Sequence, residues 1–160
     1  MRLVFSVFIA IFTFIACNTA NAQGPEQDEI LKHYEGDWLF KGDRKQMWSA
    51  SRDKNGDLTF REMFIAVCGR VTRMWKIKGN PSDDKYTGSV KTIFKEETVC
   101  SVSGEWNASE NTMTWSLDGD PDYAKIRHSF KGSKLIVTML PHSDESSSAK
   151  WSELGTLDRL

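Results

Sequence analysis

The sequence has little excess charge, few cysteines and no apolar run long enough to cross a bilayer. Its 160 residues carry 21 Lys and Arg against 22 Asp and Glu, which gives a formal net charge of -1. Proteins that bind nucleic acid usually carry a basic stripe, so this balance argues against nucleic acid as a partner. None of the three cysteines lies in a Cys-x-x-Cys pair, and zinc or dithiol chemistry therefore has little support.

Recognisable catalytic motifs are absent as well. The sequence contains no Gly-x-Ser-x-Gly elbow, no His-Glu-x-x-His, no phosphate-binding loop and no dinucleotide fingerprint. We therefore expect no catalytic residue, no metal site and no cofactor. What remains, with 39% apolar and 27% charged residues, is the composition of one ordinary folded domain.

Residues 1–22 have the pattern of a signal peptide. Arg2 precedes an apolar run from Leu3 to Cys17, which is shorter than the roughly 20 residues of a transmembrane helix. Ala20-Asn21-Ala22 then supplies the small-x-small pattern at which signal peptidases cut. We expect a secreted or periplasmic protein whose mature form, residues 23–160, is a single domain without a transmembrane span.

A second interpretation of the leader stays open. Phe14-Ile15-Ala16-Cys17 resembles the lipobox of bacterial lipoproteins. In that case residues 1–16 are the signal, Cys17 is acylated, and the protein is lipid-anchored to the cell envelope.

Two cysteines, Cys68 and Cys100, remain in the mature chain. In an exported protein two cysteines indicate one disulfide. The alternative is a pair of free buried thiols.

From Gly36 onward the sequence alternates with a period of two. Gln46–Ser51 and Leu58–Val67 flank an Asn55-Gly56 step, which is the strongest short-range signal for a β-hairpin. Thr112–Asp118 is the clearest alternating strand, because Met113, Trp115 and Leu117 share one face. About eight to ten such segments follow one another after a short N-terminal helix, with no helix long enough for a crossover. The pattern predicts an all-β, antiparallel up-and-down barrel; a β-sandwich is the alternative.

The start of the first strand reads Tyr34-Glu35-Gly36-Asp37-Trp38. Gly-x-Trp after a short helix, leading into an up-and-down run of strands, resembles the calycin superfamily, which includes the lipocalins and fatty-acid-binding proteins. The layout looks most like that of small exported bacterial lipocalin-like proteins of unknown function. The resemblance implies that Trp38 closes the base of the barrel and packs against Arg159 from the C-terminal segment.

A barrel of this size has an interior that is either filled by side chains or large enough for one small ligand. Our leading hypothesis is that the interior binds a small apolar ligand without catalysis. The residues expected to bind it are Phe60, Trp75, Phe94, Met113, Trp115 and Met139.

Two other functions stay open. An enzyme, haem-dependent or hydrolytic, needs a polar group of residues in the interior, and only His128 and Arg127 suggest one. A structural or protein-interaction barrel needs a filled core and surface aromatic residues, for which Trp48 and Trp151 are the candidates.

Overall fold

The structure is a computed structural model that describes residues 25–41, 46–64, 70–79, 85–93, 97–142 and 150–160. A short helix, α1 (Pro25–Lys32), precedes ten strands. The strands are β1 (Gly36–Phe40), β2 (Gln46–Arg52), β3 (Leu58–Phe64), β4 (Arg70–Ile77), β5 (Lys85–Thr92), β6 (Thr98–Asn107), β7 (Thr112–Asp118), β8 (Tyr123–Lys131), β9 (Lys134–Pro141) and β10 (Ser152–Arg159).

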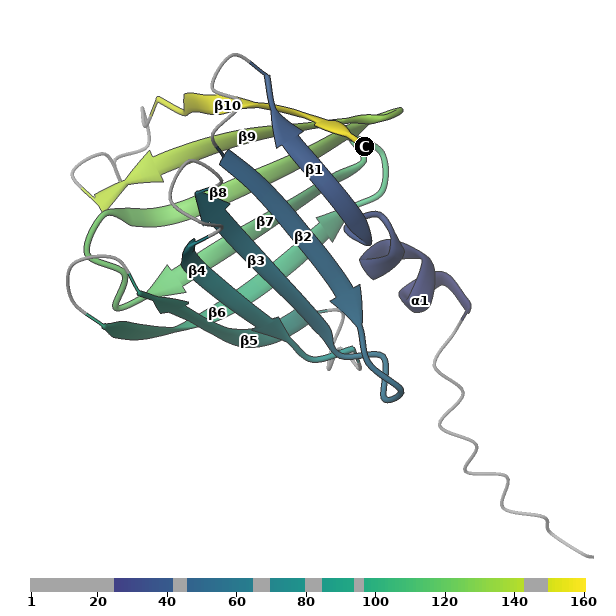
Figure 1. Cartoon of the computed structure of the whole chain (residues 1–160), viewed down its shortest axis with the longest axis horizontal. Helices are drawn as coiled ribbons and strands as arrows, with labels where there is room; N and C mark the ends of the chain where they lie inside the picture. The colour runs from purple at the N-terminus through teal and green to yellow at the C-terminus, as the bar shows by residue number, and fades with distance from the viewer. Residues whose placement is uncertain (1–24, 42–45, 65–69, 80–84, 94–96, 143–149) are drawn as a thin grey trace, which may run out of the picture.

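The strands form a closed barrel in which each strand pairs antiparallel with its neighbour in the chain (Figure 1). The last strand completes the circle by pairing with the first, and Trp38 of β1 lies opposite Arg159 of β10. The prediction of an all-β up-and-down barrel with a short N-terminal helix is therefore confirmed, and the sandwich alternative is wrong. Closure leaves no strand at an edge, which removes the unpaired backbone groups of an open sheet.

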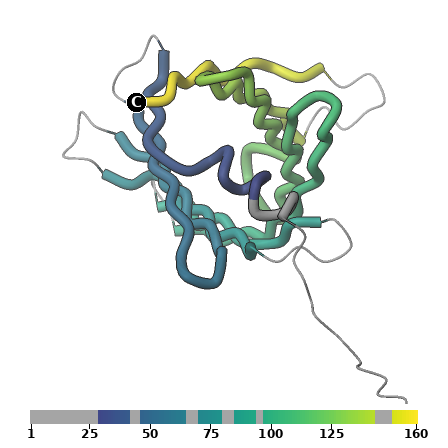
Figure 2. The backbone as a smooth tube through the Cα atoms, turned by 90° about the vertical axis from the view of Figure 1, so that its right-hand side faces the viewer, coloured from purple at the N-terminus to yellow at the C-terminus, as the bar shows by residue number. Residues whose placement is uncertain are grey.

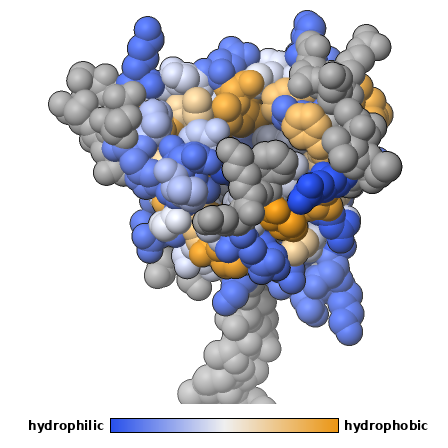
Figure 3. Space-filling model, turned by 60° about the vertical axis from the view of Figure 1, so that its left-hand side comes forward, coloured by the Kyte–Doolittle hydropathy of each residue, from blue (hydrophilic) through white to orange (hydrophobic). Residues whose placement is uncertain are grey.

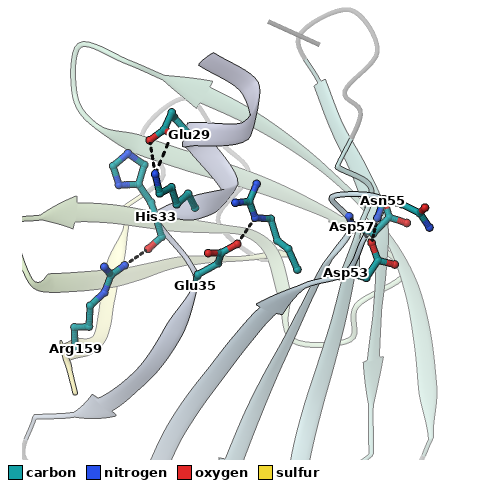
Figure 4. Close-up of polar contacts among 9 residues, drawn as sticks. Glu29, His33, Glu35, Asp53, Asn55, Asp57 and Arg159 are labelled. Atoms are coloured by element: carbon teal, nitrogen blue, oxygen red, sulfur yellow. Dashed lines mark hydrogen bonds and ion pairs between the residues drawn. The ribbon is translucent and has the colours of Figure 1, made fainter. Parts of the chain in front are cut away.

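The predicted hairpin joins β2 to β3. Gly56 has a φ of 83°, a left-handed conformation that glycine adopts without steric cost. The carboxylate of Asp53 accepts backbone hydrogen bonds from Asn55 at 2.8 Å and Asp57 at 3.1 Å (Figure 4). A side chain that caps its own turn explains why this short polar segment reverses the chain.

Helix α1 lies across one end of the barrel, which we call the helix end (Figure 2). Leu31 in α1 and Tyr34 just after it pack into the barrel core, and each has a relative exposure of 1%. Gly36, with a φ of 108°, then turns the chain into β1. The opposite end of the barrel, where β1, β3, β5, β7 and β9 finish, is called the far end.

Polar contacts hold the helix end together. The backbone carbonyl of Tyr34 accepts a hydrogen bond from the Trp38 indole at 2.9 Å. That of His33 accepts one from the Arg159 guanidinium at 2.8 Å (Figure 4). The end of the chain thus fixes the segment that joins α1 to β1.

Candidate ligand site inside the barrel

The inward face of the barrel carries most of the residues predicted to bind a ligand. Phe60, Trp75, Met113 and Trp115 are all at most 2% exposed and belong to one hydrophobic core. Met139 lies on the same face of β9 as the buried Val137 and is half-buried. Phe94 falls outside the described residues. The structure therefore brings four of the six into a shared interior, and their role in ligand binding stays a prediction.

His128 lies in the middle of this interior and is fully buried. Its Nδ1 is 2.8 Å from the hydroxyl of Tyr34 and 3.1 Å from the indole nitrogen of Trp115. The same indole N–H also lies 3.0 Å from the Tyr34 hydroxyl, so Tyr34, Trp115 and His128 form one buried polar cluster. The Nε2 of His128 is buried and has no hydrogen-bond partner among the described residues.

Aromatic rings surround the His128 imidazole. The ring centroids of Trp48, Phe60 and Trp75 lie 5.5, 6.1 and 6.0 Å from that of His128. Burial in this apolar setting lowers the pKa of His128 to about 3, because the charged imidazolium loses its hydration there. The ring is therefore neutral at physiological pH.

Towards the far end the inward face becomes charged. Glu62 follows Phe60 by two positions on β3, and Arg73 lies directly opposite it on β4. The indole of Trp75 donates a 2.8 Å hydrogen bond to Oε1 of Glu62. Burial raises the pKa of Glu62, while Arg73 and the Trp75 hydrogen bond lower it and Asp120 raises it. A carboxyl group thus sits directly above the aromatic layer.

Arg73 is held by carboxylates of the turn between β7 and β8. Its Nη2 lies 3.4 Å from Asp120 and 3.6 Å from Asp122, and its guanidinium stacks on the ring of Tyr123 at 5.0 Å. Asp120 is itself buried and also accepts the backbone N–H groups of Asp122 and Tyr123. The guanidinium is therefore already paired and fixed in position.

The sequence analysis did not identify Glu62, Arg73 or Tyr34 as site residues. A signal was available for the first two, since alternation places Glu62 with Phe60 and Arg73 with Trp75 on core-facing positions of adjacent strands. No such signal exists for Tyr34, whose burial depends on how α1 docks.

The other candidate residues are dispersed. The enzyme hypothesis needs Arg127 and His128 together, but they point to opposite faces of β8. His128 faces the core. Arg127 stacks on Trp151, with its guanidinium carbon 4.1 Å from the ring centroid.

Trp48 is only 5% exposed, so the expectation that it is a surface residue is wrong. Strand β2 has apolar residues on both faces, so its sequence pattern alone does not show which face is buried.

Trp38 and Arg159 do meet at the helix end. The guanidinium carbon of Arg159 lies 4.5 Å from the centroid of the Trp38 ring, and Trp38 is 1% exposed. Cys100 is buried and forms no disulfide with another residue that the structure describes. Its expected disulfide partner Cys68, like the lipidation candidate Cys17, lies outside the described residues, so the disulfide stays a prediction.

A separate depression of about 1120 Å³ crosses the outer wall from β3 to β8. Hydroxyl groups line much of it, from Thr87, Ser89, Ser101, Ser103 and Ser116. None of the six predicted ligand residues contributes to it. The face turned to the viewer in Figure 3 shows hydrophobic groups interspersed with hydrophilic ones.

Within the described ranges, no three His, Cys, Asp or Glu side chains converge in a way that suits a metal ion. None of the helical segments that the structure describes has the length and apolar character needed to cross a membrane.

The fold and the interior define a class of protein: a closed ten-stranded antiparallel barrel with a helix across one end and a charged layer inside the other. Neither a model of a known protein family nor a curated protein sequence matches the chain.

Proposed function

We propose that this protein is an exported, non-catalytic lipocalin-like barrel that binds a small, largely apolar molecule at the far end of its interior. The observation that carries the proposal is the Glu62 carboxyl group, which faces the core and is hydrogen-bonded to Trp75. Placing an ionisable group against an apolar core costs stability. Such groups are common where a ligand needs a polar contact to fix its orientation.

The rings beneath Glu62 supply the apolar part of the proposed site. Phe60 and Trp75 lie 5.7 Å apart, and Trp48 lies 4.7 Å from Phe60, measured between ring centroids. Half-buried Met139 is the flexible apolar residue on the opposite wall. Aromatic and thioether surfaces of this kind favour a ligand with a hydrocarbon or aromatic body.

Membership of the calycin superfamily is part of the proposal. Its support is the Gly36-x-Trp38 start of β1 together with the Arg159 guanidinium above the Trp38 ring. The closed antiparallel barrel is consistent with it.

Tryptophan fluorescence tests ligand binding directly. Titration with a panel of fatty acids, fatty alcohols and aromatic compounds should give saturable quenching for at least one of them. Trp75→Phe should reduce the amplitude, whereas Trp151→Phe, on the outer face, should retain the quenching. Absence of saturable quenching by every compound would exclude the binding function.

Export is tested at the mature N-terminus. We expect mass spectrometry of the protein recovered from its native compartment to show Gln23 as the first residue. A diacylated Cys17 would instead establish the lipid-anchored form. An uncleaved Met1 would contradict both.

A filled barrel that acts in the envelope through its surface is the second candidate. It is favoured by the four rings within about 6 Å of His128, which occupy the middle of the interior. The same fluorescence titration separates the two functions.

A further inference from the structure

Among the residues that the structure describes near the far end, the carboxylates around Arg73 outnumber its single positive charge. Arg73 forms ion pairs with Asp120 and Asp122. No ion pair within 4 Å involves Glu62 among the residues that the structure describes, although Arg73 stands opposite it in the strand register. Within the described ranges, Glu62 is therefore an inward carboxylate with no cation in direct contact.

Aromatic rings flank this carboxylate on two sides. Trp48 is its direct cross-strand neighbour on β2, and Trp75 on β4 donates to its Oε1. An indole face attracts cations through its quadrupole, and the attraction grows when water is displaced. A carboxylate between two tryptophans is thus suited to an organic cation, which gains an ion pair and ring contacts at once.

An anion is suited less well to the same place. To reach Arg73 it must compete with Asp120, which is 3% exposed and fixed by two backbone hydrogen bonds. It would also approach Glu62, whose like charge opposes it. The fixed charges therefore discriminate between ligands of opposite sign.

We propose that the ligand is an amphipathic organic monocation, an amine or quaternary ammonium compound, whose charge pairs with Glu62 and whose apolar body lies on Trp48, Phe60 and Trp75. This inference rests on the proposed binding function and names the chemical class of its ligand.

Three probes with the same alkyl chain and different charges test it: decyltrimethylammonium, decanol and decanoate, each kept below its micelle concentration. Tryptophan fluorescence of the mature protein at pH 7 and low salt gives the three dissociation constants. We expect the cation to bind about tenfold more tightly than the alcohol, and decanoate to bind most weakly.

Glu62→Gln isolates the carboxylate, since the amide oxygen can still accept the Trp75 hydrogen bond. The variant should lose the preference for the cation and bind it about as weakly as decanol. Glu105→Gln is the matched control, because Glu105 lies on the outer face, where it pairs with Lys85. This control should retain the wild-type preference.

The outcomes separate the two proposals. If decanol or decanoate binds as tightly as the cation, or if Glu62→Gln keeps the preference, the cation assignment is wrong and the binding function stands. If none of the three probes, nor any compound of the wider panel, gives saturable quenching, both proposals fail.

Discussion

At the scale of single residues, the burial of His128 makes the stability of the fold depend on pH. Its side chain is fully buried, two groups hold its Nδ1, and the pKa of about 3 keeps it neutral in the folded state. The unfolded chain takes up a proton near pH 6.5, whereas the folded protein does so only near pH 3. Stability contributed by the neutral ring is therefore present above pH 6.5 and is lost progressively as the pH falls towards 3.

The shifted pKa of His128 should be visible in how the free energy of unfolding changes with pH. Between pH 7 and pH 5 the titration of His128 should lower the free energy of unfolding by about 2 kcal/mol. His128→Gln has no titratable ring, so its decline over the same interval should be smaller by about that amount. Urea unfolding at the two pH values measures both. An identical decline in the two proteins would show that the ring is not buried as described.

Glu62 has the opposite pH dependence. Burial raises the pKa of its carboxyl group, with Asp120 adding to the rise and Arg73 opposing it. Because the folded state then holds the proton to higher pH than the unfolded state, stability falls as the pH rises above about 4.5. Glu62→Gln should therefore be more stable than the wild type at pH 7, with the difference shrinking by pH 4. A less stable variant at pH 7 would show that the carboxylate serves the fold rather than a ligand.

At the scale of strands, β6 has to pass very close to a tryptophan. A Cβ at Gly104 would lie 2.4 Å from the ring of Trp115, closer than any real contact. Glycine within a strand commonly marks such an approach. The same tryptophan donates to Tyr34 and His128, so its position matters to the whole interior.

Gly104→Ala should consequently overpack the core. We expect it to lower the free energy of unfolding by about 2 kcal/mol, since Trp115 has to move. Ser103→Ala, on the exposed outer face of the same strand, should change stability by less than about 0.5 kcal/mol. Chemical denaturation of the two variants makes the comparison. Equal stabilities would show that the ring adapts without cost.

The strands were the predictable part of this molecule. Alternation of Met113, Trp115 and Leu117 and the Asn55-Gly56 turn are local signals, and both predict the element that the structure contains. Placement across the barrel is not local. Trp48 is buried because β2 turns that face inward, and Tyr34 reaches His128 over 94 residues of sequence. The polar centre of the interior could therefore not be derived from any single segment.

At the scale of the whole molecule, the barrel is a single closed ring of hydrogen bonds. Removing β10 exposes the edges of β1 and β9 and takes the fully buried Leu157 out of the core. Deletion of residues 152–160 should abolish cooperative thermal unfolding, measured by near-ultraviolet circular dichroism. Deletion of Leu160 alone, which is 73% exposed, should preserve it. Cooperative unfolding of the longer deletion would show that the ring tolerates a gap.

The pairing of β1 with β10 also determines when, during synthesis of the chain, the barrel can close. Strand β1, which carries Trp38, is translated well before its partner strand β10, and eight other strands are made in between. Pairings between such distant segments slow folding, because the loop between them has to be ordered first. A nascent chain therefore cannot complete its native ring before β10 has been translated, and until then its β1 edge stays available to chaperones.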